Sequence, residues 1–250
     1  MSSYRDFLKN QSLPGMSETE TDQMKGLPLP PIEKPCPMNT TLIPLPAPQD
    51  LDLGTVSLID IINQRRSRRK YTEISLNLEE LSFLLWTTQG MQKLIRNDLL
   101  TLRTVPSGGG MHPFETYLFI NKVDGLEPGI YRFIATQHKL LPINTNAEGL
   151  AEKIGEACNG QTFIGKGAVV FFWCARPYRT EWRYSEDSLK DILISVGHIC
   201  QNLYLACESI DAGTCGILAY QQQPLEEIIE VDGEDEILLY LAPVGKIASG

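Results

Sequence analysis

Residues 188–213 read SLKDILISVGHICQNLYLACESIDAG and contain a long helical pattern. Apolar side chains repeat there at alternating spacings of three and four residues, the period of an α-helix with one buried face: Leu193, Val196, Cys200, Leu203, Cys207 and Ile210. The opposite face is apolar too, with Ile194 and Leu205 among its residues. We therefore expect a helix that is buried almost all round, in the domain centre or against a second subunit, and that stops at Gly213.

The segments on either side of this helix mix strands and helices. Residues 115–122 (ETYLFINK) predict a strand, residues 129–143 a short hairpin, and residues 167–175 (GAVVFFWCA) and 236–246 (EILLYLAPVGK) buried strands. Helical spacing predicts four further helices, in residues 55–67, 77–90, 148–158 and 224–230. The second begins with a capping box of Asn77 and Glu80 and ends at Gly90. Because βαβ alternation is missing, the fold class is α+β around one sheet.

The chain divides by composition near residue 52. Residues 1–52 are rich in proline, as in LPLPPIEKPCP (27–37) and LIPLPAP (42–48). Such a segment favours extended conformations and does not easily build its own core. We expect an extended arm over residues 1–52, lying on the domain surface or free as a tail or recognition segment, and one folded domain over residues 53–250.

Bulk composition excludes several functional classes. The 250 residues are 42% hydrophobic and carry a net charge of -9, which argues against a broad nucleic-acid or anionic-membrane surface. No apolar run is long enough to span a membrane, and the first residues lack the apolar stretch of a signal peptide. The cysteines form no CxxC pair and the histidines have no metal-ligand spacing. We expect a cytoplasmic, reduced protein without a metal, in which Cys200 and Cys207 are buried apolar groups.

A basic cluster, QRRSRRKY (64–71), interrupts this acidic chain. A charge run is usually a solvated surface, but this one closes a predicted helix and includes Ser67. Arginine presents a planar fork of donors that matches phosphate oxygens, and a hydroxyl adds another donor. The cluster is thus either a bland surface or a clamp for a monophosphate.

A glycine-rich loop, TVPSGGGMHPFE (104–115), precedes the strand at 115–122. It is neither a P-loop nor a dinucleotide fingerprint, because no Gly-Lys-Ser/Thr ends it and no strand comes before it. Three glycines remove side-chain bulk so that a flat ligand could reach backbone amides, and Ser107 and His112 can donate hydrogen bonds to it. The alternative is a plain turn into the strand. A third small-residue element, Gly-Thr-Cys-Gly (213–216), follows the long helix and by itself indicates only a helix end.

Taken in order, these elements resemble the nitroreductase superfamily of flavin enzymes, and within it the SagB/thiazole-oxazole oxidase-type dehydrogenases. The matching stretches are RRSRRKY (65–71), LLWTTQG (84–90), RTVPSGGGMHPFETYLFI (103–120), GLEPGIYRF (125–133), VGHICQNLYLACESIDAGTCGI (196–217) and APVGK (242–246). The resemblance implies a mostly antiparallel sheet flanked by helices, a homodimer with FMN between its subunits, and NAD(P)H as a redox partner.

Matched position by position, the resemblance implies a set of FMN-binding residues. The ribityl phosphate and its chain would meet Arg65, Arg66, Ser67 and Arg69, with Lys246 completing the phosphate site. The ring would lie against Pro106, Ser107 and Gly108, with His112 nearby, and against the turn of Gly213, Thr214 and Gly216. Gly110 stands where simple nitroreductases often have asparagine. Since FMN carries negative charge on its phosphate, a basic clamp in an acidic protein suits it.

The substrate is less defined by the resemblance. Azoline-oxidising relatives carry a Lys-Tyr pair near the flavin, and Arg183-Tyr184 takes that place here. Tyr184 could act as an acid or base or contact the substrate, but arginine cannot accept a proton, and Tyr184 could equally be an ordinary structural tyrosine. Three hypotheses stay open: an FMN oxidoreductase acting on a small or peptide-derived substrate, a peptide-azoline dehydrogenase making thiazoles or oxazoles, and a flavin-binding module without turnover.

Overall fold

The computed structural model describes residues 20–97 and 99–248. Its strands are β1 (Ile43–Pro44), β2 (Met91–Ile95), β3 (Leu100–Arg103), β4 (Phe114–Ile120), β5 (Gly129–Ile134), β6 (Lys139–Asn144), β7 (Val169–Ala175), β8 (Ala212–Thr214) and β9 (Ile237–Lys246). Its α-helices are α1 (Leu58–Gln64), α2 (Leu78–Gln89), α3 (Leu150–Ala157), α4 (Tyr178–Tyr184), α5 (Ser188–Glu208) and α6 (Gln222–Ile229). Short 3₁₀ turns are η2 (Pro48–Asp50), η3 (Gly108–Gly110) and η4 (Ser185–Asp187).

Seven strands form one sheet in the order β1-β6-β5-β4-β7-β9-β8. Every neighbouring pair in it is antiparallel, so the predicted α+β class with an antiparallel sheet is confirmed. β7 pairs with β4 on one side and β9 on the other, and all its residues are buried. This agrees with the apolar character of residues 167–175, since a strand covered on both faces needs apolar side chains throughout.

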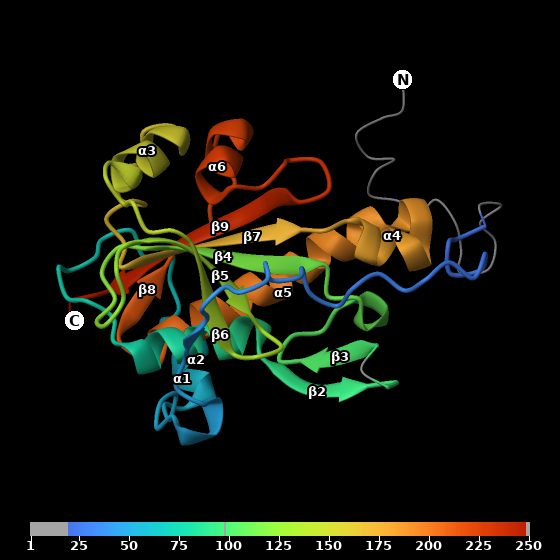
Figure 1. Cartoon of the computed structure of the whole chain (residues 1–250). Coiled ribbons are helices and arrows are strands. Elements are labelled where there is room, and N and C mark those ends of the chain that lie inside the picture. Colours follow the sequence, from blue (N-terminus) through green and yellow to red (C-terminus); the bar gives the residue numbers. More distant parts are fainter. Residues whose placement is uncertain (1–19, 98, 249–250) are drawn as a thin grey trace, which may run out of the picture.

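Helices cover both faces of the sheet (Figure 1), with α2 and α5 on one and α3 and α6 on the other. Alternate residues of β7 separate into the two resulting cores because successive side chains of a strand point to opposite faces. Phe171 and Trp173 pack toward α2 and α5, whereas Val170 and Phe172 pack toward α3 and α6. The sheet is therefore the middle of three layers.

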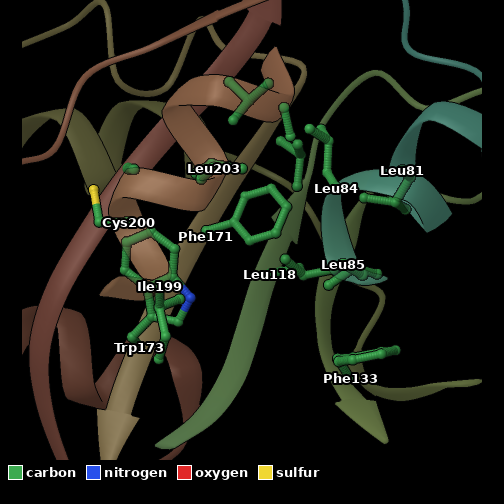
Figure 2. Packing of buried hydrophobic residues seen from close by; sticks show 14 of the residues in the cluster. Leu81, Leu84, Leu85, Leu118, Phe133, Phe171, Trp173, Ile199, Cys200 and Leu203 are labelled. Atoms are coloured by element: carbon green, nitrogen blue, oxygen red, sulfur yellow. The ribbon is translucent and has the colours of Figure 1, made fainter. Parts of the chain in front are cut away.

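The larger core lies between α2, α5 and the sheet (Figure 2). Its labelled members come from three strands and two helices and are all buried: Leu81, Leu84, Leu85, Leu118, Phe133, Phe171, Trp173, Ile199, Cys200 and Leu203. Full burial of one such side chain contributes roughly 1.5–3 kcal/mol. This packing fixes the position of α5 against the sheet.

The ends of α2 follow the sequence prediction. Asn77 Oδ1 accepts the Glu80 N–H at 2.8 Å, and Glu80 Oε2 accepts the Asn77 N–H at 3.0 Å, which is a complete capping box. The helix ends at Gln89, and Gly90 forms its C-terminal cap.

One expectation about α5 was wrong, because the helix ends at Glu208 rather than at Gly213, which instead lies in β8 and pairs with Gly245. In the single chain the helix buries one face, and Leu193, expected on the core stripe, and Ile194 are about half exposed. Burial of the other face against a second subunit stays a prediction. The apolar period therefore identified the helix but not which side of it faces solvent in a single chain. Cys200 and Cys207 are buried free thiols, as expected.

The β2–β3 hairpin was not predicted, and β3 overturns the expectation that no strand comes before the glycine loop. The hairpin forms a separate two-stranded sheet, and Arg96 and Asn97 at its turn both have positive φ. Tight hairpin turns usually contain Asn-Gly or Asp-Gly. Arg96 at positive φ is not part of such a pair, and arginine rarely adopts this conformation. The sequence pattern therefore did not predict this turn.

The described part of the proline-rich arm, residues 20–52, is extended and lies on the folded domain. It runs from beside α4 toward α1, in blue in Figure 1. Near its end β1 pairs with β6 at the edge of the sheet, Ile43 opposite Leu140. The domain boundary near residue 52 stays a prediction.

Candidate active site

The basic segment at residues 65–69 lies beside β8. The backbone of Ser67 forms a parallel bridge with Thr214, and the Arg68 N–H donates to the Thr214 carbonyl at 2.9 Å. These contacts bring the arginine-serine cluster and the Gly-Thr-Cys-Gly turn together, two elements that are about 150 residues apart in sequence. Because the segment is extended here, its side chains alternate between two sides.

Tyr204 on α5 joins the same elements. Its hydroxyl lies 3.2 Å from Ser67 Oγ and accepts the Gly216 N–H at 2.8 Å. The Arg65 guanidinium lies over its ring, 5.4 Å from the centroid. Tyr204 was not predicted as a site residue, because in sequence it is one more semi-apolar position of a long helix.

The arginines of the segment differ in their partners. Arg68 pairs with Glu208 at 3.1 Å, and its side chain fills the space that a Cβ would need at Gly213. Within the described ranges, no carboxylate pairs with the guanidinium of Arg65, Arg66 or Arg69. The Arg66 guanidinium instead donates to two nearby backbone carbonyls. Guanidinium groups without a carboxylate partner, beside a serine hydroxyl, are a donor set that fits a phosphate.

Lys246 lies at the end of β9, where its ammonium group is already engaged. It donates to Glu80 Oε1 of the α2 capping box and to the Ile210 carbonyl, the latter at 2.6 Å. An ammonium has three N–H donors, so one remains for a phosphate. The structure thus places Lys246 first of all as a tie between β9, α2 and the end of α5.

The glycine loop lies along the other edge of the buried face of α5. The Ser195 hydroxyl on that helix donates to Ser107 Oγ at 3.2 Å, and the His112 N–H donates to the same oxygen at 3.1 Å. Ser107 Oγ therefore acts twice as an acceptor, and its own hydrogen remains available to a ligand. Pro106 beside it is exposed.

The three glycines make room first for the protein's own side chains. A Cβ at Gly108 would clash with the carboxylate of Asp191, and one at Gly109 with the hydroxyl of Tyr184. At Gly110 the space is open, but the residue has φ +70. Gly109 has φ +58, so glycine suits both positions for backbone reasons as well. The expected close approach to this backbone is therefore made, in the single chain, by α4 and α5.

His112 lies under the loop rather than free beside it. It is 6% exposed with φ +43, and burial, helped by the charges of Arg103 and Arg179, lowers the pKa of its imidazole to about 3. At neutral pH the ring is therefore uncharged. It can hydrogen-bond as a neutral group but does not exchange protons near pH 7.

Tyr184 is the last residue of α4 and meets the loop directly. Its hydroxyl lies against Gly109, and the Arg183 guanidinium lies 5.6 Å from the centroid of its ring. Both members of the predicted Arg-Tyr pair are thus at the glycine loop. Asp191, which sequence reasoning missed, flanks the neighbouring glycine, and burial raises the pKa of its carboxyl.

The predicted residues therefore form two groups in one chain. The first holds the basic segment and the turn at 213–216, and the second holds the loop at 106–112 with Tyr184. No hydrogen bond or ion pair within residues 20–97 and 99–248 joins them directly. Ser195 and Tyr204, which touch one group each, are nine residues apart, and nine residues turn a helix by about 900°, or half a turn beyond two full ones. α5 thus stands between the two groups.

The described residues contain neither a membrane-spanning helix nor a cluster of metal ligands. None of the helices in the described ranges is long and apolar enough to cross a membrane. Across the same ranges, no three His, Cys, Asp or Glu side chains are grouped as a metal ion would require.

Comparison with known proteins agrees with this architecture. A model of the nitroreductase family matches residues 62–246. A Methanocaldococcus jannaschii protein named as a nitroreductase is 31% identical over 195 residues, 78% of this chain and 93% of its own. The trifolitoxin operon protein TfxC of Rhizobium leguminosarum bv. trifolii is 25% identical, over 78% of this chain and 56% of its own.

Solved structures share the fold. A structure from Ralstonia eutropha, titled as a nitroreductase, has a TM-score of 0.68 at 23% identity and covers 90% of this chain and 100% of its own. The Escherichia coli microcin synthetase McbBCD complex, with truncated pro-MccB17 bound, has a TM-score of 0.61 at 17% identity over 78% of this chain and 74% of its own. With its family model matched across both groups of site residues, the chain belongs to the nitroreductase family of FMN-dependent oxidoreductases.

Proposed function

We propose that two copies of this chain bind FMN between them and transfer a hydride between the flavin and a small or peptide-derived substrate, with NAD(P)H as the other redox partner. The single observation that carries the arrangement is the position of α5, which separates the basic segment from the glycine loop within one chain. A ligand that contacts both the basic segment and the glycine loop would therefore bind the segment of one copy and the loop of the other.

The exposed surface of a single chain supports pairing with a second copy. α1 packs against α5, and both helices expose large apolar side chains, among them Ile59 (62%), Ile62 (50%) and Ile194 (51%). Large apolar side chains exposed on two helices that pack together favour an interaction site. In the proposed homodimer these residues are buried.

The residues would divide the work as follows. Arg65, Arg69 and Ser67 hold the phosphate, with Arg66 at the edge of the cluster, and the turn at 213–216 and the Ser107 hydroxyl contact the ring. FMN, when bound, supplies the two-electron chemistry, and the protein orients it. The Tyr184 phenol is the acid or base at the loop, since its O–H can both donate and accept whereas the guanidinium of Arg183 has only donors.

A peptide-derived substrate is supported by the relatives from the trifolitoxin and microcin systems. The more specific alternative is a peptide-azoline dehydrogenase, which would remove two hydrogen atoms from a thiazoline or oxazoline. Arg183 in place of lysine weakens this alternative, because it cannot take the proton that leaves. Incubating the loaded protein with an azoline peptide separates the two: loss of two hydrogen atoms by mass spectrometry supports the dehydrogenase, and an unchanged mass supports another substrate.

The test of the shared site is subunit complementation. One variant carries Arg69→Met and the other Gly109→Ala, and each is expected to bind FMN poorly by fluorescence titration. If each site takes its parts from two copies, refolding the variants together in equal amounts restores about a quarter of the sites, because half of the dimers are mixed and each has one intact site. No recovery in the mixture, with dimers confirmed by sedimentation, would show that each chain builds its site alone.

A further inference from the structure

The N-terminal arm is attached to α4 near its beginning. The Trp182 indole N–H donates to the Leu27 carbonyl at 3.0 Å, and the Gln23 N–H donates to the Trp182 carbonyl at 2.9 Å. An exposed bond from Tyr178 to Asp22 adds to them. The arm lies outside residues 62–246, which the family model matches.

Arg179 connects the arm to the glycine loop. This arginine is 3% exposed, and its guanidinium donates to the Pro31 carbonyl of the arm at 2.8 Å and to the His112 carbonyl of the loop at 3.4 Å. It also forms an ion pair with the buried Glu115 on β4. One side chain of α4 therefore holds the arm, the end of the loop and the sheet together.

The arm is itself anchored at several further points. Glu115 accepts the Lys34 N–H at 2.6 Å, while the Lys34 ammonium pairs with Glu236 at 2.6 Å. Buried arginines from the sheet side donate to arm carbonyls, Arg103 to Ile32 at 3.2 Å and Arg132 to Lys34 at 2.9 Å. These bonds satisfy the carbonyls of a proline-rich segment that cannot pair as a regular strand.

α4 depends on such contacts because it is short. It has seven residues, and a helix of that length is not stable by its own hydrogen bonds. Its buried residues are Arg179, Thr180 and Trp182, and two of these three bind the arm. Its last residue is Tyr184, whose hydroxyl lies on Gly109.

We infer that Arg179 and Trp182 are positioning residues, through which the N-terminal arm holds α4 and Tyr184 against the glycine loop. The inference rests on the proposed function for its catalytic meaning, but not for the mechanical coupling itself. Loosening the arm loosens the Tyr184 end of the site and leaves the basic segment at 65–69 in place.

The test measures hydrogen–deuterium exchange in the FMN-free full-length chain. Trp182→Phe removes one buried N–H bond to a carbonyl, and Tyr220→Phe removes a comparable O–H bond to the Leu238 carbonyl, also 3.0 Å long, on the far face of the sheet. A neutral hydrogen bond corresponds to roughly a fivefold change in a local opening equilibrium. We expect about that acceleration in the arm, in α4 and in the loop at 108–112 for Trp182→Phe, and in none of these for Tyr220→Phe.

A second variant, Arg179→Lys, tests the same coupling through a different side chain. Arg179→Lys keeps a positive charge for Glu115 but loses the fork that reaches both the arm and the loop, so its effect on the loop is expected to be larger than that of Trp182→Phe. With FMN bound, both variants are expected to lower kcat while the FMN Kd stays within about twofold. Faster exchange of the arm with wild-type exchange in the loop and α4 would overturn the inference. Since exchange needs neither flavin nor substrate, that result is distinguishable from a failure of the proposed function.

Discussion

Replacing single arginines of the basic segment by methionine is expected to separate cofactor binding from folding. Arg65, Arg68 and Arg69 lie within five residues, and the chemical change is the same at each. Their partners differ: Arg68 is bound to Glu208, whereas Arg65 and Arg69 have no carboxylate partner in the described ranges. The sequence resemblance assigns Arg65 and Arg69, but not Arg68, to the FMN phosphate.

The contacts of Arg69 and Arg68 set the expected loss of FMN affinity and of stability for the two variants. A charge-assisted hydrogen bond to phosphate contributes about 1.5–3 kcal/mol, and each 1.4 kcal/mol is tenfold in Kd, so Arg69→Met is expected to weaken FMN binding by roughly 10- to 150-fold. Its stability should change little, as for most surface substitutions. Arg68→Met leaves the Glu208 carboxylate, 4% exposed, with one remaining backbone donor, which costs about 1–3 kcal/mol.

The assay combines two measurements on the same three variants. Fluorescence titration gives the FMN Kd, and thermal unfolding without FMN gives Tm. For a domain of this size each 1 kcal/mol shifts Tm by about 2–4 °C, so Arg68→Met should lower Tm by on the order of 2–12 °C with a smaller change in Kd. The reverse pattern, with Arg68→Met losing FMN at an unchanged Tm and Arg69→Met melting early, would refute the assignment.

Three more predictions concern the loop and the end of β9. The folded pKa of His112 is about 3 and its unfolded value is 6.5, so as pH falls the unfolded chain takes up a proton first and the free energy of unfolding decreases progressively from pH 6.5 toward pH 3. His112→Gln should flatten that part of a stability–pH profile measured by urea unfolding. Gly109→Ala should cost more stability than Gly110→Ala, since both have positive φ but only Gly109 is against a side chain, and Tyr184→Phe should recover part of the difference in a double-mutant cycle; equal losses would contradict the contact. Lys246→Met should lower Tm by several degrees, because it breaks the tie to α2, and an unchanged Tm with weaker FMN binding would favour a role in the phosphate site alone.

Much of the fold could be predicted because its signals are local. The capping box of α2 depends on residues three apart, and the buried strand β7 shows as a continuous apolar run. The end of α5 could not be predicted in this way. Gly213 looked like a helix stop, yet its small size is needed because Arg68 packs against it from a segment about 145 residues away, and no local pattern reports such a neighbour.

The site shows the same division. Motifs located the basic segment, the loop and the turn, and the structure brings the first and third together through Tyr204. The roles of Tyr204 and Asp191 depend on which edge of α5 each residue occupies relative to other elements, and this is decided by how the helix packs. The arm contacts were equally unpredictable, since backbone carbonyls of a proline-rich segment accept hydrogen bonds whatever its side chains are.

The alternation of side chains along an extended segment predicts which arginines lie on the same side as the Ser67 hydroxyl. Ser67 faces Tyr204, and residues two apart in an extended segment share a side, so Arg65 and Arg69 lie on the side of the Ser67 hydroxyl. The Arg65 guanidinium over the Tyr204 ring agrees with this. By the same alternation Arg66 and Arg68 belong to the opposite side, and the Arg68 guanidinium there meets Glu208. A phosphate held at Ser67 is therefore served by Arg65 and Arg69 before Arg66, although the sequence resemblance assigns all three to it alike.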